Sequence, residues 1–218
     1  MGFAVVIAGG DVPDNRLLAE FSEAELVVAA DAGVRVARTH GLPIHAVIGD
    51  LDSASDGDLA WASAEGADVI ELPADKDETD LELALEHADS GVDVIVVVGV
   101  SGGRLDHELG NWAALCAPRT AVVEARTVSG TATILHGDTC EQRSFEGKPG
   151  EVISLIPRLG PVHGVTTSGL RWPLEDATLH PERTRGISNE FEATQSQVSI
   201  REGALMVVRP YPTVINPR

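Results

Sequence analysis

Short runs of apolar, β-branched residues alternate with amphipathic stretches through the first half of the chain. The strongest run, Val92–Val98, is typical of a strand buried on both faces of a sheet. Between Leu81 and Ala88, apolar residues recur at the spacing of one helix face, which predicts a helix. The predicted strands are Phe3–Ala8, Leu26–Ala30, Ala46–Ile48, Asp68–Leu72, Val92–Val98 and Thr120–Glu124, and the predicted helices are 14–21, 34–40, 59–64, 81–88 and 104–115. This alternation predicts an α/β fold, a doubly wound, mostly parallel sheet with helices on both faces.

The pattern changes after about Arg126. Helical periodicity disappears, and short β-like runs recur between turn residues at 132–135, 152–155, 162–167, 197–201 and 204–209. The segment Val198–Val208, with Glu202-Gly203 at its centre, predicts a β-hairpin. We therefore expect two domains, an α/β domain at 1–125 and an all-β sandwich at 126–218.

Acidic residues follow the ends of several predicted strands. Parallel sheets of this kind bind ligands outside the carboxyl ends of their strands. The acids after four different strands are Asp31, the pair Asp50 and Asp52, the segment Asp75 to Asp80, and Asp106. They are therefore expected to gather on one edge of the sheet, together with the segment Gly9-Gly10-Asp11 that follows the first strand.

Asp50 and Asp52 flank one residue, so in an extended segment their carboxylates point to the same side and could hold one magnesium ion. Lys76 would neutralise part of the acidic cluster or reach a phosphate. Thr79 and Asp80 nearby also have structural explanations. Thr79 fits the N-cap of a helix capping box with Glu82, and Asp80 suits the positive end of a helix dipole.

The segment Gly99–Asn111 combines a glycine-rich turn with the start of a helix, where unpaired N–H groups suit a phosphate. Arg104 adds a fork of donors that matches phosphate oxygens. Asp106 beside them indicates a bound cation or a proton to be carried. The alternatives are an Arg–Asp surface pair, a packed or capping His107, and an ordinary helix-surface amide at Asn111. The chain has no P-loop motif, no protein-kinase motif set and no full dinucleotide fingerprint.

Composition and net charge restrict the classes of partner that the chain is expected to bind. The formal charge of −18, from 34 acidic and 16 basic residues, argues against nucleic acid or an anionic membrane as a partner. No run is long and apolar enough to span a membrane, and Met1–Gly10 predicts a first strand rather than a signal peptide. Cys116 and Cys140 lack metal-ligand spacing and are expected to be free thiols in the cytoplasm. Because only two of the 16 bases are lysines, adaptation to high salt is a further hypothesis.

Several motifs resemble those of the thiamine pyrophosphokinase family, in the same order. The catalytic motifs are Asp31–Gly33, Gly49–Ser53, Asp75–Asp80 and Gly102–His107 with Asn111, and those of the thiamine-binding β domain are Thr167–Leu174, Gly186–Glu190 and Val198–Leu205. The resemblance covers nearly the whole chain. Two departures bear on the nucleotide contact of the Asp31 turn: Ala32, where the family usually has glycine, and Val34-Arg35, where the family commonly has an asparagine.

The resemblance implies transfer of a pyrophosphoryl group from ATP to thiamine, giving thiamine diphosphate and AMP. It implies a homodimer, with thiamine held between the catalytic domain of one subunit and the β domain of the other. Asp50, Asp52 and Asp80 would hold magnesium and the phosphates, Arg104 and Asp106 would lie at the transferred group, and Ser188 and Asn189 would contact thiamine. We expect ATP to contact Gly9, Asp31, Gly33, Lys76, Thr79, Gly103, His107 and Asn111.

Three questions stay open at this level. The group that accepts the proton of the alcohol is Asp80 or Asp106. Trp172 could stack on thiamine, although a tryptophan before a proline in a β domain is more often packed. The alternative functions are a pyrophosphokinase for another hydroxymethyl heterocycle, such as 6-hydroxymethylpterin, and a nucleotide or thiamine sensor without turnover.

Overall fold

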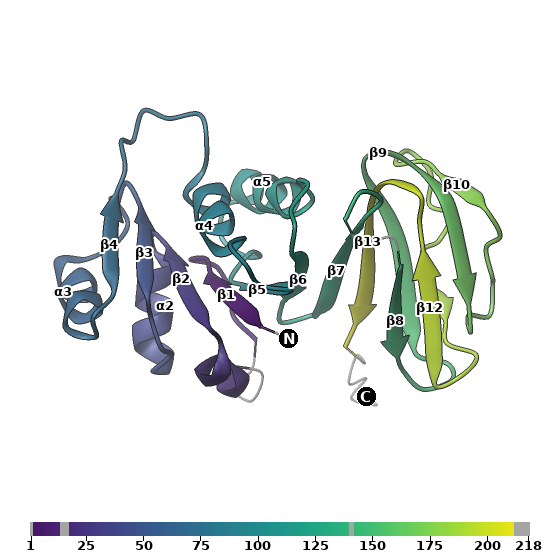
Figure 1. Ribbon diagram of the computed structural model, residues 1–218, viewed down its shortest axis with the longest axis horizontal. Helices are drawn as coiled ribbons and strands as arrows, with labels where there is room; N and C mark the ends of the chain where they lie inside the picture. The colour runs from purple at the N-terminus through teal and green to yellow at the C-terminus, as the bar shows by residue number, and fades with distance from the viewer. Residues whose placement is uncertain (1, 14–17, 140–141, 212–218) are drawn as a thin grey trace, which may run out of the picture. The chain divides into compact units, whose positions relative to one another are not determined.

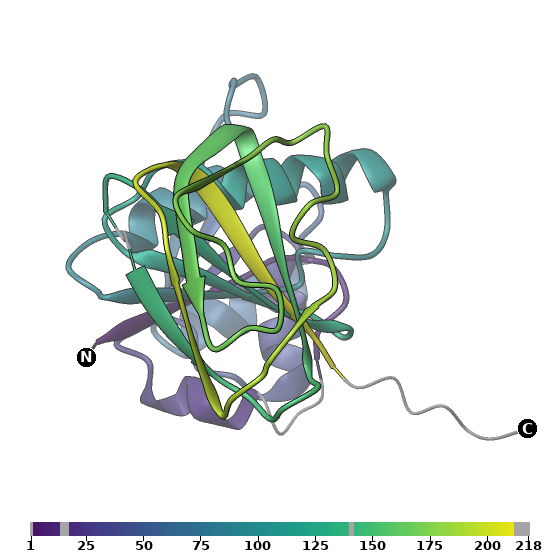
Figure 2. The same ribbon diagram turned by 90° about the vertical axis from the view of Figure 1, so that its right-hand side faces the viewer.

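The chain forms two compact units in the computed structural model, which describes residues 2–13, 18–139 and 142–211. The N-terminal unit comprises residues 1–115 and 119–128, and the C-terminal unit comprises 116–118 and 129–218. Figure 1 labels most strands and helices of both units. Figure 2 shows the same ribbon turned by 90° about the vertical axis.

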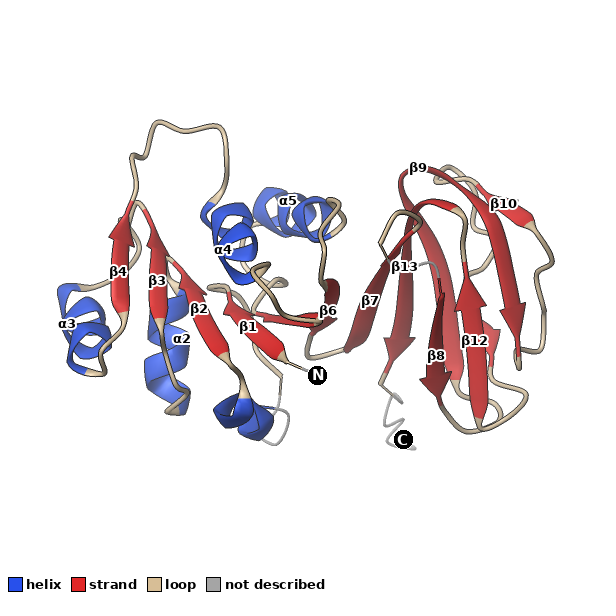
Figure 3. Cartoon of the chain, viewed as in Figure 1, coloured by secondary structure: helices blue, strands red, loops and turns tan. Residues whose placement is uncertain are grey.

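The N-terminal unit is built on six strands, drawn in red in Figure 3, which pair in parallel in the order β4-β3-β2-β1-β5-β6. The strands are β1 Phe3–Ile7, β2 Leu26–Ala30, β3 Ala46–Gly49, β4 Asp68–Glu71, β5 Val94–Val98 and β6 Val122–Arg126. All six strands predicted for this half are present, so the expected α/β class is confirmed. The central strands are continuous apolar runs because both of their faces are buried.

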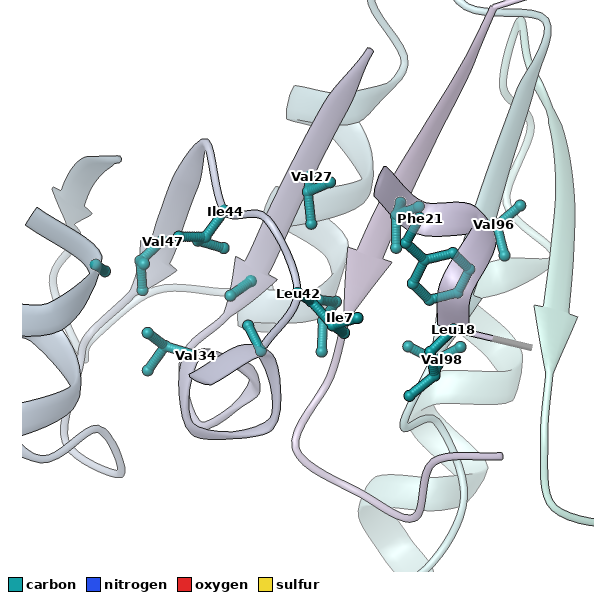
Figure 4. Packing of buried hydrophobic residues seen from close by; sticks show 14 residues of the cluster. Ile7, Leu18, Phe21, Val27, Val34, Leu42, Ile44, Val47, Val96 and Val98 are labelled. Atoms are coloured by element: carbon teal, nitrogen blue, oxygen red, sulfur yellow. The ribbon is translucent and has the colours of Figure 1, made fainter. Parts of the chain in front are cut away.

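Helices cover both faces of this sheet. They are α2 Gly33–His40, α3 Asp56–Ala64, α4 Asp80–Ala88 and α5 Leu105–Leu115. Figure 4 shows one face, where Ile7, Val27 and Val47 of three strands lie in one layer with Val34 of α2. The opposite face is covered by α4, which packs on β1, β2 and β3 and buries its apolar stripe there.

The predicted helix at 14–21 is only partly testable, because residues 14–17 lie outside the described part of the chain. The regular element found there is a 3-10 helix, η1, at Ala19–Glu23. Its Phe21 is fully buried in the layer that Figure 4 shows. The element is therefore shorter and tighter than the α-helix that the sequence predicted.

The C-terminal unit is all β, as expected, and encloses its own apolar core. Its strands are β7 Gly130–His136, β8 Gln142–Glu146, β9 Val152–Ser168, β10 Ala177–Leu179, β11 Asn189–Glu190, β12 Gln195–Ser199 and β13 Glu202–Pro210. The long strand β9 pairs with β13 along its first half and with β12 along its last residues. The apolar core of this unit includes Leu155 from the first half of β9 and Val165 from the second half.

The predicted hairpin at Val198–Val208 is wrong. Its two halves, β12 and β13, pair along β9 instead of with each other: Val198 is opposite Thr167, and Val207 is opposite Leu155. Gly203 has φ +96°, and a Cβ there would lie 2.8 Å from the Pro161 carbonyl oxygen. The glycine thus permits a close approach to β9 and makes no turn. The separate strands expected at 152–155 and 162–167 are also parts of one long strand, β9.

Within the described residues, no helix is long and apolar enough to cross a membrane. Cys116 is buried. The other cysteine, Cys140, lies outside the described residues, so the expectation of two free thiols is tested only in part.

Candidate active site

The sheet of the N-terminal unit changes direction between β1 and β5. From β1 the chain adds β2, β3 and β4 on one side, and it then returns to add β5 and β6 on the other. Connections leave the carboxyl ends of β1 and β5 in opposite directions, and a crevice at such a point is the usual ligand site of an open α/β sheet. A cleft of about 790 Å³ lies here, lined by the turns that follow β1, β2, β3, β4 and β5.

Most of the site residues expected from the sequence line this cleft. They are Gly9, Asp31, Asp50, Asp52, Lys76, Thr79, Asp80, Gly103, Arg104, Asp106, His107 and Asn111. Gly33 is buried and is not among the described lining residues, and Ser188 and Asn189 belong to the C-terminal unit. Asp11 and Ser53 also line the cleft. The sequence placed both in segments expected at this edge, but neither was named as a site residue. The signal for both was their place directly after a strand, beside residues that had been selected.

Gly33 has a packing role in the first turn of α2. A Cβ at this position would lie 1.9 Å from the Ile7 carbonyl oxygen of β1, so only glycine lets α2 approach the strand this closely. The preceding Ala32 fits because its neighbour is also a glycine: a Cβ at Gly9 would lie 2.9 Å from the Ala32 methyl group. Ala32 is therefore accommodated at the position where the motif usually has glycine.

Three aspartates form the tightest acidic group in the described residues. Asp31, Asp50 and Asp52 each offer a carboxylate oxygen, and these oxygens lie within 4.8 Å of one another. The backbone N–H of Asp52 donates to Asp50 Oδ1 at 3.2 Å, and the Ser53 hydroxyl donates to Asp52 Oδ1 at 2.8 Å. The sequence motif thus folds into a turn that holds two carboxylates on the same side.

Asp31 is the most constrained member of this group. Its backbone is left-handed, with φ 41°, and its Oδ1 is buried without a hydrogen-bond partner. Burial raises the pKa of Asp31, and the charges of Asp80 and Asp52 raise it further, against hydrogen bonds from Ala32 and Ser53 that lower it. A buried, unpaired carboxylate oxygen beside two more carboxylates is costly without a cation. The donor set is all oxygen, which suits a hard divalent ion.

Asp80 begins α4 directly beside this group. A Cβ at Gly49 would lie 3.0 Å from Asp31 Cβ and 3.0 Å from Asp80 Cγ, so the glycine leaves room for both acids. Lys76 Nζ lies 3.1 Å from Asp80 Oδ1. The capping box expected at the start of α4 is present, with Thr79 and Glu82 bonded in both directions.

Arg104 and Asp106 face each other at the start of α5. Arg104 Nη2 donates to Asp106 Oδ2 at 2.6 Å, and Nε donates to Oδ1 at 3.1 Å. The Arg104 hydrogen bond and charge lower the pKa of Asp106 to about 2. Both side chains are exposed, so solvent screens the pair and leaves the guanidinium accessible to another anion.

The surroundings of two neighbouring residues exclude one alternative for each. Asn111 is half-buried, and its Nδ2 donates to the Val100 carbonyl oxygen at 3.0 Å, so it is not an ordinary surface amide. His107 is exposed and lines the cleft, so it is not a packed histidine. Whether either contacts ATP stays a prediction.

The residues expected to meet thiamine lie together in the C-terminal unit. Asn189 is 4% exposed; its Oδ1 accepts the backbone N–H of Trp172, and its Nδ2 donates to the Trp172 carbonyl oxygen. Ser188 is exposed and left-handed, with φ 56°. Trp172 is 52% exposed. The guanidinium carbon of Arg171 lies over its indole, 4.7 Å from the centroid of the ring. The interpretation of Trp172 as a packed residue is therefore wrong, because Asn189 holds its backbone while its ring faces solvent.

Known proteins share this architecture and these motifs. Residues 17–125 match the family profile "Thiamin pyrophosphokinase, catalytic domain", and residues 140–205 match "Thiamin pyrophosphokinase, vitamin B1 binding domain". The chain is 29% identical over 209 residues to a thiamine pyrophosphokinase of Bacillus subtilis, covering 94% of this chain and 96% of that protein.

Two crystal structures extend the likeness to the fold. A thiamine pyrophosphokinase from Bacillus subtilis superimposes with a TM-score of 0.81 at 25% identity, covering 96% of this chain and 99% of that chain. A thiamin pyrophosphokinase from Geobacillus thermodenitrificans superimposes with a TM-score of 0.76 at 25% identity, covering 98% and 99%. The matches extend across both units.

Proposed function

Because the chain belongs to the thiamin pyrophosphokinase family and is a thiamine diphosphate-forming enzyme, we propose that it transfers a pyrophosphoryl group from ATP to the hydroxyethyl oxygen of thiamine. The products are thiamine diphosphate and AMP. The observation that carries this proposal is the cleft at the β1/β5 crevice, where an arginine, a helix start and a group of aspartates converge. A cation between these carboxylates and a polyanion would reduce the repulsion between them.

Magnesium is the proposed cation, and the Asp31–Asp50–Asp52 group would hold it. The buried, unpartnered Oδ1 of Asp31 supports this fit, because a cation would satisfy an oxygen that otherwise lacks a partner. When bound, magnesium supplies charge neutralisation on the phosphates and on the leaving AMP. Asp31 thereby joins Asp50 and Asp52 as a proposed ligand, and Asp80 beside them is available to the metal or to the substrate.

The chain's own donors are proposed to orient the transferred group. Arg104 presents a planar fork that matches two phosphate oxygens, and it would exchange its exposed partner Asp106 for the phosphate. The first turn of α5 and the neighbouring Gly103 offer backbone N–H groups to the same anion. Little covalent work is needed in such a transfer, so alignment and charge neutralisation supply most of the catalysis.

The alcohol of thiamine must lose a proton as it attacks the β-phosphorus. Paired with Arg104, Asp106 has a pKa of about 2 and is a weak proton acceptor; it becomes a better acceptor once Arg104 has moved to the phosphate. Asp80 and Asp106 are therefore both proposed as acceptors, Asp80 beside the proposed magnesium ligands and Asp106 beside the transferred group. Lys76 Nζ lies 3.1 Å from Asp80 Oδ1 and pairs with that carboxylate.

Thiamine recognition is proposed for the C-terminal unit, on Ser188, Asn189 and Trp172. The exposed indole offers a face for the flat, cationic ligand, and Asn189 holds that indole in place through its backbone. We propose a homodimer in which thiamine is held between the N-terminal unit of one subunit and the C-terminal unit of the other.

The test is an assay of AMP release with ATP, magnesium and either thiamine or 6-hydroxymethylpterin. We expect AMP and thiamine diphosphate in equal amounts, and only with thiamine. AMP formed with the pterin alone would replace the substrate but keep the chemistry. A folded protein that binds nucleotide and releases no AMP would be a sensor, and the proposal would fail.

A further inference from the structure

The loop that joins β5 to α5, here called the glycine loop (Gly99–Gly103), is held from two sides. On one side the turn after β1 pairs with it: Gly10 N donates to Gly99 O at 2.9 Å, and Asp11 N donates to Ser101 O at 2.7 Å. On the other side two side chains of α5 reach back to it. These are Asn111, which donates to Val100 O at 3.0 Å, and Glu108, whose Oε2 accepts the Gly102 N–H at 3.1 Å.

The loop needs such support at one point in particular. Gly102 and Gly103 have φ +94° and +74°, two consecutive left-handed residues, and glycine adopts many other conformations at similar cost. No side chain of their own restricts them. Arg104 follows directly, so any change of backbone direction at this glycine pair would carry its guanidinium away from the cleft.

Glu108 restricts the backbone of Gly102 and Gly103 from the side of α5. It is half-buried on α5 and is not among the described residues that line the cleft, although Gly102, Gly103 and Arg104 are. The Gly102 N–H therefore points toward the helix and is not offered to a ligand. A carboxylate placed near a phosphate site weakens anion binding, so this glutamate has a cost that its hydrogen bond to the loop must offset.

We propose that Glu108 is a positioning residue, which fixes the Gly102–Gly103 backbone by its hydrogen bond and so aims Arg104 at the transferred phosphoryl group. This inference rests on the proposed function, because it acts through the role given there to Arg104. Glu108 touches neither substrate nor metal. Its contribution is to fix the position of Arg104, which lies two residues after Gly102, the hydrogen-bond partner of Glu108.

The experiment compares Glu108→Ala, Glu108→Gln and Glu86→Ala in the full-length protein. Gln keeps an oxygen that accepts the Gly102 N–H and removes the charge, whereas Ala removes both. Glu86 is exposed on α4 and does not line the cleft, so its variant is a control for losing one negative charge from a helix of the same unit. For each protein we would measure Tm, kcat, the KM for thiamine and the affinity for α,β-methylene-ATP, well below the Tm.

In Glu108→Ala we expect kcat to fall about 10- to 100-fold, because misplacement of a catalytic group by about 1 Å has effects of this size. The KM for thiamine should not change. Glu108→Gln should stay within about twofold of the wild type, and Glu86→Ala should match it. A role confined to stability would lower Tm and leave the kcat of the folded protein unchanged, which would overturn the proposal. So would a Gln variant as impaired as the Ala variant, because charge and not the hydrogen bond would then matter.

The two proposals fail in different ways. If the wild type releases no AMP, the proposed function falls. Glu108 is then judged on the affinity for α,β-methylene-ATP, which should fall about 10-fold in Glu108→Ala and remain unchanged in Glu86→Ala. If the wild type is active but Glu108→Ala behaves as Glu86→Ala does, the Glu108 proposal alone falls.

Discussion

Replacing Asp31 with asparagine should stabilise the metal-free protein while it removes activity. Three carboxylate oxygens lie within 4.8 Å of one another in the Asp31–Asp50–Asp52 group. At that distance each pair of charges repels by about 0.9 kcal/mol in water and about 3.5 kcal/mol at an effective dielectric constant of 20. Asp31 and Asp50 are half-buried and Asp52 is exposed, so a value near the lower figure applies.

Asp31→Asn removes two of these repulsive pairs, which amounts to about 2 kcal/mol. Asparagine tolerates the left-handed backbone at this position at least as well as aspartate, so the substitution adds no strain. For a chain of this length, about 2 kcal/mol corresponds to a rise in Tm of about 4–8 °C. The same change takes one ligand from the proposed magnesium site, and stabilisation by the ion should shrink accordingly.

The assay is calorimetry at low ionic strength, with EDTA or with saturating magnesium. The variant should melt above the wild type in EDTA, and this advantage should vanish or reverse in magnesium. Asp68→Asn is the matched control, because Asp68 is exposed on β4, away from the cleft, and its loss should change stability by less than about 0.5 kcal/mol. An Asp31→Asn protein that melts below the wild type in EDTA, or gains as much from magnesium as the wild type does, would refute the reasoning.

Three further predictions follow from the same structure. Arg104→Lys keeps the charge but loses the fork, so kcat should fall about 100-fold with Tm unchanged; a drop below threefold in a steady-state assay would argue against bidentate phosphate binding. Burial alone would raise the pKa of Asp89, but hydrogen bonds from Thr120 and Ala121 outweigh it and lower that pKa, so this contribution to stability is present above about pH 4 and is lost as the solution becomes more acidic. Asp89→Ala should cost about 2–3 kcal/mol by chemical denaturation at pH 7, and much less near pH 2; equal losses at both pH values would contradict the assignment. If the excess of 34 acidic over 16 basic residues reflects adaptation to salt, Tm should rise between low and molar salt, and a flat or falling Tm would remove that hypothesis.

The N-terminal fold could be predicted because its signals are local. Strand β5 is a continuous apolar run and α4 a clear amphipathic stripe with its own cap, so both are visible within ten residues of sequence. The rule that parallel strands present their carboxyl ends on one edge then collects acids that are far apart in the chain. Asp31 and Asp80 line one cleft for this reason, although 48 residues separate them.

The errors arose where long-range pairing competes with local signals. Glu202-Gly203 has the composition of a hairpin turn, but β9 offers pairing partners on both sides of it, and the segment stays extended along that strand. Nothing near Trp172 in sequence indicates that Asn189, 17 residues away, holds its backbone and leaves the ring exposed. The hydrogen bond from Gly102 to Glu108 was likewise out of reach, because it depends on the orientation of a side chain on α5.

The central claim is that both terminal phosphoryl groups of ATP move together to thiamine. The most direct measurement is phosphorus NMR of a single turnover with ATP that carries an isotopic label in its β-phosphate, in the presence of thiamine and magnesium. The account predicts that the label appears only in thiamine diphosphate and that the unlabelled product is AMP. Labelled ADP accompanied by thiamine monophosphate would contradict it, because that result would mean transfer of a single phosphoryl group.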